Sequence, residues 1–238
     1  MKAIILAAGL GNRLQEILEG KPKPLLKVKN KSIIQYSLDA LSKTSLKKIH
    51  IVIGHKGEFI KNEIGSRYKN LEISYCNNDL YSSTGSMHSL FCGLNEPEDC
   101  LVLDGDIIYE DNILEEIISN KQKNLVLLTK CGSRGDEVFV TLENEKVIYL
   151  SKKKPENKKM FEFTGISKFS RDFMKKMFEV HNKEMTEGNS SDYYEDCALK
   201  TGKIIPLYGL IKEDLIWSEI DNKEDYYYVL EKIIPNLK

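Results

Sequence analysis

The chain has 238 residues, with 35 basic and 36 acidic side chains, so its formal net charge is −1. This balance excludes a basic field over the whole molecule and argues against general nucleic-acid binding. The longest apolar run, Ala3–Ala8, is far shorter than the roughly 20 residues of a membrane-spanning helix. We therefore expect a globular protein that does not insert into membranes.

The residues that follow this run do not have the form of a signal peptide, because glycines and Arg13 come at once. We therefore expect a cytoplasmic protein. The five cysteines have no CxxC or zinc-type spacing, which predicts reduced thiols rather than disulfides or a zinc site. The four histidines show no HxxxH or HExxH pattern, so we expect no histidine metal site.

Apolar runs and helical spacings alternate along the first 130 residues. The expected strands are Lys2–Ala7, Ile49–Ile53, Leu71–Tyr75, Cys100–Leu103 and Leu125–Thr129. The expected helices are Ile33–Leu41, Phe59–Tyr68, Ser86–Leu94 and Ile113–Ser119. Buried strands that alternate with helices are typical of a doubly wound, mostly parallel α/β sheet.

The pattern changes after about residue 131. The segments Glu137–Leu142 and Lys146–Leu150 predict an antiparallel hairpin. The C-terminal third is therefore expected to decorate the sheet as a small antiparallel elaboration. No linker separates two domains, so we predict a single domain over residues 1–238, with a nucleotide-binding part at 1–130 and an acceptor-binding, metal-completing part at 131–238.

A glycine-rich loop follows the first strand. It contains Gly9, Gly11 and Arg13, and Lys23 comes ten residues after the arginine. Such loops hold phosphates, because their backbone N–H groups can approach an anion without side chains in the way. The loop fits neither the Rossmann fingerprint nor the P-loop motif. Two cations beside it suit a triphosphate, whereas the glycines alone also fit an ordinary tight turn.

The segments LAAGLGNRL and PKPL resemble the N-terminal signature of the nucleotidyltransferases with a Rossmann-like fold. The resemblance implies a three-layer α/β fold, and it implies that Arg13 and Lys23 are catalytic. It also implies that the loop residues bind the nucleotide, namely Leu6, Ala7, Ala8, Gly9, Gly11 and Asn12.

Carboxylates follow two later segments. Asp104 and Asp106 end an apolar strand and share one face by alternation. Near a triphosphate they would suit Mg²⁺, which prefers hard oxygen ligands, although an Asp-Gly turn is the plain alternative. The family resemblance implies that Asp106 and Asp221 hold Mg²⁺ and that Asp104 contacts the nucleotide. Asp221 also fits a helix cap.

These parts predict a reaction class. A phosphate oxygen of the acceptor would attack the α-phosphorus of a nucleoside triphosphate, and pyrophosphate would leave. A phosphate monoester is already largely dianionic at neutral pH, so no general base is required. Positioning and charge neutralisation would carry the catalysis.

The loop 81–90, with Thr84, Gly85 and Ser86, resembles the small-residue loop of the phosphocholine and 2-aminoethylphosphonate cytidylyltransferase branch. The resemblance implies that this loop recognises the base of CTP. Helix capping by Ser83 or Thr84 is the alternative.

An acidic and aromatic segment points to a cationic acceptor, because carboxylates and ring faces bind ammonium groups. The expected acceptor-binding residues are Lys152, Asp136, Glu195, Asp196, Tyr194 and Trp217. Lys152 would bind the acceptor phosphate, with Lys154 as its rival. A solvated helix face is the alternative for the two acids after Tyr194.

The predicted function is a Mg²⁺-dependent cytidylyltransferase. It would join CMP from CTP to a phosphorylated or phosphonylated amino alcohol of the phosphocholine, phosphoethanolamine or 2-aminoethylphosphonate type. Such products feed the modification of cell-surface glycans or lipids. The alternatives are a sugar-1-phosphate nucleotidylyltransferase that uses UTP, dTTP or GTP, and a catalytically silent nucleotide-binding domain. The oligomeric state stays open, with a homodimer among the options.

Overall fold

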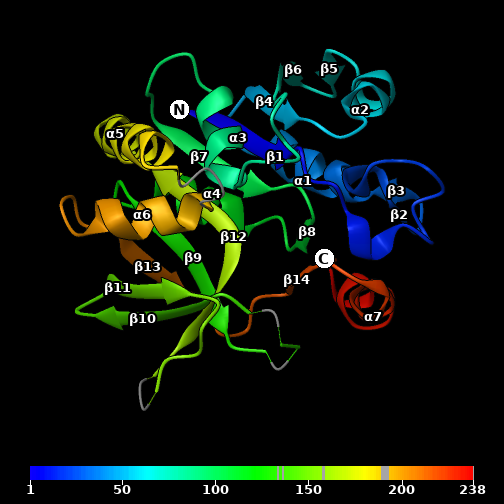
Figure 1. Cartoon of the computed structure of the whole chain (residues 1–238). Coiled ribbons are helices and arrows are strands. Elements are labelled where there is room, and N and C mark those ends of the chain that lie inside the picture. The colour runs from blue at the N-terminus through cyan, green and yellow to red at the C-terminus, as the bar shows by residue number, and fades with distance from the viewer. Residues whose placement is uncertain (133, 136, 157–158, 189–192, 238) are drawn as a thin grey trace.

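The computed structural model describes residues 1–132, 134–135, 137–156, 159–188 and 193–237. A ten-stranded sheet runs through it (Figure 1), with the strand order β10-β11-β13-β9-β12-β7-β1-β4-β6-β5. The strands of the first half are β1 (Lys2–Ala7), β4 (Lys48–Ile53), β5 (Arg67–Tyr68), β6 (Leu71–Asn77), β7 (Cys100–Asp104) and β9 (Leu125–Lys130). Those of the second half are β10 (Phe139–Glu143), β11 (Lys146–Ser151), β12 (Phe161–Phe169) and β13 (Tyr208–Ile211).

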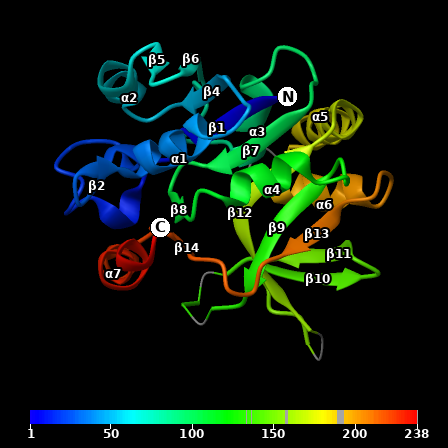
Figure 2. The same ribbon diagram turned by 180° about the vertical axis from the view of Figure 1, so that it is seen from behind.

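Helices cover both faces of the sheet, which makes three layers (Figures 1 and 2). On one face lie α1 (Ile33–Ser42), α2 (Gly57–Ile64) and α4 (Ile113–Ser119). On the other lie α3 (Ser86–Cys92), α5 (Arg171–Thr186) and α6 (Tyr194–Gly202). Strand β1 serves both layers, because Ile5 packs in the first core and Ile4 in the second. The expected three-layer α/β fold is confirmed.

The parallel part of the sheet matches the expected strands. Strand β1 pairs in parallel with β4 and β7, and β4 pairs in parallel with β6. The hairpin of β10 and β11 is antiparallel, also as expected. The first helix begins at a capping box, in which Gln35 accepts a hydrogen bond from the N–H of Ser32 at 2.8 Å.

Two expectations about elements were wrong. The helix expected over Phe59–Tyr68 ends at Ile64, because Gly65 has φ 72°, and left-handed backbone ends a helix. The last two residues of that range form β5 instead. The C-terminal third does more than decorate the sheet, since β12 lies in its middle, antiparallel to both β7 and β9. Every residue of β12 is buried, so this strand is central to the core.

A small two-stranded sheet lies at the carboxyl end of the large sheet. Strand β8 (Ile107–Tyr109) pairs antiparallel with β14 (Trp217–Glu219), and α7 (Lys223–Tyr228) follows. The short ribbon of β2 (Lys27–Val28) and β3 (Lys31–Ser32) lies beside α7 (Figure 2). A third apolar cluster, around Leu14, Ile108 and Ile220, packs these pieces together. This packing brings the chain after β14 next to the loop after β7.

Within the described part of the chain, no helix has the length and apolar character needed to cross a membrane.

Candidate active site

A cavity of about 640 Å³ opens at the carboxyl ends of β1 and β7. Its walls also include the start of α3, the middle of β12, the start of α6 and the segment after β14. In open α/β sheets, ligands bind in the crevice at this edge. Most of the sequence-predicted site residues line it: Leu6, Ala8, Gly9, Gly11, Asn12, Arg13, Lys23, Thr84, Gly85, Ser86, Asp104, Asp106, Lys152, Glu195 and Asp221.

The glycine loop forms one end of the cavity. Gly11 has φ 64°, a conformation that favours glycine, and its carbonyl accepts a hydrogen bond from the N–H of Leu14 at 3.1 Å. A Cβ atom at Gly11 would lie 3.0 Å from the Cβ of Lys23. The absence of a side chain therefore allows the loop to pack directly against the lysine.

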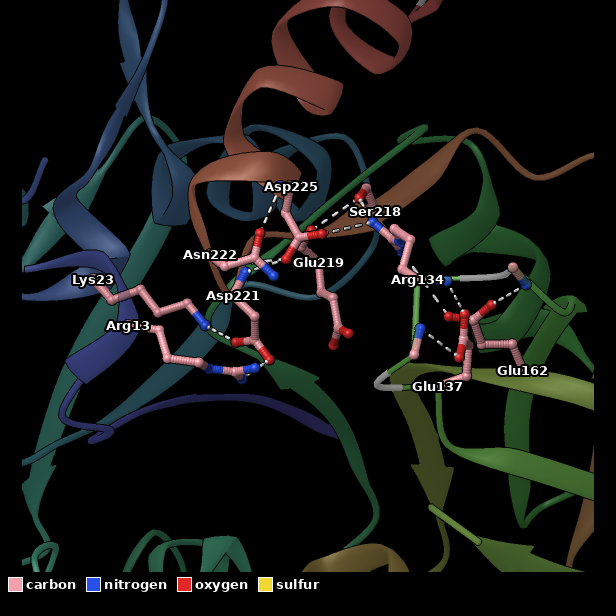
Figure 3. A network of polar contacts seen from close by, with 12 residues as sticks. Arg13, Lys23, Arg134, Glu137, Glu162, Ser218, Glu219, Asp221, Asn222 and Asp225 are labelled. Atoms are coloured by element: carbon pink, nitrogen blue, oxygen red, sulfur yellow. Dashed lines mark hydrogen bonds and ion pairs between the residues drawn. The ribbon is translucent and has the colours of Figure 1, made fainter. Parts of the chain in front are cut away.

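The ammonium of Lys23 joins the two aspartates that were expected to hold Mg²⁺. Its Nζ donates to Oδ2 of Asp106 at 2.7 Å. The same nitrogen donates to Oδ1 of Asp221, and Arg13 donates to the other oxygen of Asp221 (Figure 3). Asp221 reaches this place because the β8–β14 pairing continues past the strands: the N–H of Ile220 donates to the carbonyl of Asp106 at 3.0 Å. The two distant segments thus meet at one cation.

Lys23 and Asp221 stabilise each other's charged forms. Burial alone would lower the pKa of Lys23, but the charges of Asp106 and Asp221 outweigh it and raise that pKa. Burial alone would raise the pKa of Asp221, and the charges and hydrogen bonds of Lys23 and Arg13 lower it instead. Lysine and carboxylate therefore stay ionised at neutral pH.

The residues fit a magnesium ion. Asp106 and Asp221 converge on one point, which a cationic nitrogen occupies here. Magnesium is usually held by one or two carboxylates together with substrate phosphates. Among the described residues, no group of three His, Cys, Asp or Glu side chains could hold a metal ion. A metal at this pair would thus need the oxygens of a bound substrate.

The loop before α3 is held by a buried asparagine. The side chain of Asn78 donates to Ser89 at 2.9 Å and to Thr84 at 3.2 Å, and it accepts from the N–H of Leu80 at 2.9 Å. Helix α3 begins after Gly85 with no side-chain cap, so the alternative of capping by Ser83 or Thr84 was wrong. The hydroxyl of Ser86 accepts from the N–H of Tyr194 at 2.9 Å, which ties α3 to α6.

Three further carboxylates line the cavity, those of Asp104, Glu195 and Glu219. Burial, followed by the charges of nearby carboxylates, raises the pKa of Asp104 well above its usual range. Burial also raises the pKa of Glu195, to about 7, even though a backbone hydrogen bond and Lys152 act in the opposite direction. Both carboxyl groups therefore hold a proton to higher pH than an exposed carboxyl group does.

Glu219 and Tyr193 are among the lining residues that sequence reasoning missed. Glu219 lies two positions before Asp221, the same spacing that joins Asp104 to Asp106, so alternation could have found it. Tyr193 lines the cavity, with Nζ of Lys152 5.1 Å from its ring centre. Nothing in the sequence distinguishes Tyr193 from the next tyrosine.

Several expected site residues lie elsewhere. Tyr194 is 1% exposed and packs against Phe163 and Phe169, because it begins α6 on the core side. Trp217 is buried and donates from Nε1 to the carbonyl of Thr164 at 2.9 Å.

Two further expected positions are also absent from the cavity wall. Ala7 faces the core under the first helix layer. Asp196 is turned to its own helix start, where it accepts from the N–H of Tyr193 at 3.3 Å. Asp136 lies outside the described residues. Lys152 lines the cavity, whereas its rival Lys154 is not among the described lining residues.

The chain matches the model of the nucleotidyl transferase family over residues 2–235. It belongs to this family. The enzyme class expected from the sequence, a nucleotidyltransferase, is thereby confirmed.

Among curated relatives, a CTP:phosphoglutamine cytidylyltransferase of Campylobacter jejuni is 26% identical over 98% of this chain and 100% of its own length. A choline-phosphate cytidylyltransferase of Streptococcus pneumoniae is 27% identical over 99% of both chains. A bifunctional protein GlmU of Methanococcus vannielii is 30% identical over all of this chain but only 57% of its own. Relatives with different acceptors thus share the family.

A solved structure of CTP:phosphocholine cytidylyltransferase from Streptococcus pneumoniae has the same fold. Its TM-score is 0.78 at 24% identity, with 97% of both chains covered. The expected branch of the family is therefore represented among the most similar proteins by both sequence and fold.

Proposed function

We propose that the chain is a CTP-dependent cytidylyltransferase that transfers CMP to a small phosphorylated or phosphonylated amino compound and releases pyrophosphate. The observation that carries the proposal is the meeting of Asp106 and Asp221 at Lys23, below the glycine loop and beside Arg13. A triphosphate on the loop would find both cations at its phosphates and a carboxylate pair for its metal.

In the proposed reaction, an oxygen of the acceptor phosphate forms a bond to the α-phosphorus of CTP. The bond from that phosphorus to the bridging oxygen breaks, and pyrophosphate leaves with the electron pair. No proton has to be removed from a dianionic phosphate, in agreement with a cavity whose lining, among the described residues, contains no histidine. Lys23 and Arg13 would stabilise the charge that develops on the transferred phosphoryl group.

Asp106 and Asp221 are the residues that would hold Mg²⁺, which when bound neutralises phosphate charge and orients the triphosphate. The lysine that joins them in this structure would then turn its ammonium toward the phosphates.

Two features support CTP as the nucleotide. The relatives that match this chain over its whole length and theirs are named for cytidylyl transfer. The loop 81–86, which lines the cavity, carries small residues whose backbone groups can approach a base closely. Asn78 and Ser86 hold both ends of the loop in place.

The cationic end of the acceptor would lie against Glu195 and Glu219, since both side chains line the cavity and carboxylates attract an ammonium group. Lys152 would bind the acceptor phosphate. Its nitrogen lies 5.1 Å from the ring of Tyr193, which limits the positions that the lysine can take. Phosphocholine, phosphoethanolamine and 2-aminoethylphosphonate all have this pattern of one anionic and one cationic end.

The test is a panel of nucleotides and acceptors, with pyrophosphate release as the measurement. We expect release with CTP plus one of the three amino compounds, and little with UTP or dTTP plus glucose-1-phosphate. Turnover with the sugar pair alone would make the chain a sugar-1-phosphate nucleotidylyltransferase. Binding of CTP without pyrophosphate release, with every phosphate acceptor, would leave a silent nucleotide-binding domain.

A further inference from the structure

An arginine outside the cavity wall, Arg134, contacts both flanks of the segment that presents Asp221 (Figure 3). Its Nη1 donates to the hydroxyl of Ser218 at 2.5 Å, and the same nitrogen lies 3.5 Å from Oδ1 of Asp225. Ser218 belongs to β14, before Asp221, and Asp225 belongs to the first turn of α7, after it. One guanidinium therefore joins the two elements between which the metal-binding aspartate is expected to stand.

Asp225 continues this connection to the backbone of Asp221. Its Oδ2 accepts from the N–H of Asp221 at 2.9 Å and from the N–H of Asn222 at 3.2 Å. A capping box needs only the bond to Asn222, which is the cap residue of α7. The additional bond to Asp221 holds the residue whose carboxylate contacts Lys23.

Asp225 is 2% exposed. A buried charge is costly unless it is paired and hydrogen-bonded. Arg134 supplies the opposite charge, and its guanidinium carbon lies 5.8 Å from the ring centre of Trp217 and 5.5 Å from that of Tyr228. The rings keep the arginine at its place against α7.

The loop that carries Arg134 is itself tied down. The carboxylate of Glu137 accepts from the N–H groups of Arg134 and Gly135. Glu162, in the buried strand β12, accepts from the N–H of Gly132 at 2.7 Å and lies 3.9 Å from Nη2 of Arg134. The connection therefore runs from the middle of the sheet to the segment of Asp221.

We propose that Arg134 and Asp225 are positioning residues that hold Asp221 in the orientation in which it binds the divalent ion. This inference rests on the proposed function, because it assigns the ion to Asp106 and Asp221. Partners that orient metal ligands typically change metal affinity or activity by about 10–100-fold when they are removed. Neither residue is among the described residues that line the cavity, so their effect is expected on the metal rather than on the nucleotide.

The test measures the binding of Mn²⁺ to the whole protein in the presence of CTP, by the electron paramagnetic resonance signal of the free ion. We expect D225N and R134M each to weaken Mn²⁺ binding by about 10-fold or more, with CTP affinity in EDTA close to that of the wild type. R134K keeps the charge and should recover part of the loss. The two residues act through one contact, so their effects should not add. The double variant should bind Mn²⁺ with about the affinity of whichever single variant binds it more weakly.

The matched control is D39N. Asp39 also receives several donors, among them Tyr68 at 3.0 Å, but it lies on α1 away from the cavity. The D39N variant should be less stable than the wild type but should bind Mn²⁺ with the same affinity. Hydrogen exchange gives a second readout, in which the N–H groups of Asp221 and Asn222 should exchange faster in D225N.

Wild-type Mn²⁺ affinity in the folded variants would overturn the inference and leave the proposed function standing, and so would an equal loss in D39N. If D225N does not fold, R134M decides, because the side chain of Arg134 is 24% exposed and tolerates replacement more readily than the buried Asp225 does. A wild type that binds no Mn²⁺ with CTP would overturn both the inference and the proposed function.

Discussion

Two groups of charged residues in the cavity are stabilised in different ways. At the glycine loop, Lys23 and Arg13 are paired directly with Asp106 and Asp221. The second group consists of Asp104, Glu195 and Glu219, and burial raises the pKa of Glu195 and Asp104. A carboxylate paired with a cation can exchange that partner when a polyanion and a metal arrive, whereas burial favours the neutral form of a carboxyl group. The proposed function assigns the first group to the phosphates, as the phosphate end, and the second group to the acceptor, as the acceptor end.

The strongest test of the glycine-loop end is K23A. Removal of the ammonium leaves the developing phosphoryl charge without its main partner, so we expect pyrophosphate release to fall by about 100-fold or more. Steady-state kinetics with CTP and the acceptor measures this. K27A is the control, because Lys27 pairs with Glu63 at 2.7 Å away from the cavity. Near-normal rates in K23A would remove the basis for the assignment of this end.

The second test concerns the close approach of β12 to Asp104. Gly165 in β12 has φ 77°, and a Cβ there would lie 2.6 Å from Oδ2 of Asp104. Backbone strain of this kind costs about 1–3 kcal/mol, and each kcal/mol lowers the melting temperature by about 2–4 °C in a chain of this size. We expect G165A to melt at a lower temperature in differential scanning calorimetry. G188A is the control, since Gly188 also has positive φ but has open space around it. An equal loss in both variants would mean that backbone strain alone, and not the contact with Asp104, causes the effect.

The third test separates the two ends by their substrates. E219Q removes a negative charge from the acceptor end, so we expect the KM for a cationic acceptor to rise by about 10-fold, roughly the value of one hydrogen bond to a charged group. The KM for CTP should stay within about twofold. Initial rates with each substrate varied in turn give both constants. Equal changes in the KM for CTP and the KM for the acceptor would show that Glu219 does not act on the acceptor alone.

The smallest effect is expected from the stability of E195Q. The pKa of Glu195 rises from its ordinary value of 4.5 to about 7, so the folded state holds this proton more tightly than the unfolded state does. The wild type therefore loses stability as the pH rises from 4.5 to 7. Glutamine has no such loss, so we expect E195Q to melt several degrees above the wild type at pH 8 but at the same temperature near pH 4.5. Melting curves across this range measure the difference, and a gap that does not change with pH would contradict the expectation.

Parts of the site that depend on neighbours along the chain could be predicted from the sequence. The strand Lys2–Ala7, the glycine loop and the strand before Asp104 have apolar runs and turn residues in one continuous segment. Their geometry follows from local backbone preferences and from the burial of alternate side chains. The same reasoning placed Asp104 and Asp106 at the carboxyl end of the sheet.

Residue type alone could not predict which side chains line the acceptor end of the cavity. Tyr193 and Tyr194 are adjacent and chemically identical, yet the first lines the cavity and the second is buried. The start of α6 decides between them, because the hydroxyl of Ser86 accepts from the N–H of Tyr194 and fixes the helix against α3. Trp217 has the chemistry of a ligand-binding ring, but the pairing of β14 with β8 turns it into the core.

The sequence by itself determined the residue types at the phosphate end and the order of the first strands and helices, because these depend on contacts between near neighbours. Only the tertiary structure decided that Asp106 and Asp221 meet at Lys23, that β12 enters the middle of the sheet, and that Arg134 reaches α7. Those contacts join segments far apart in the chain. They form where hydrogen bonding between strands and the burial of apolar faces are satisfied together, and no local pattern records that outcome.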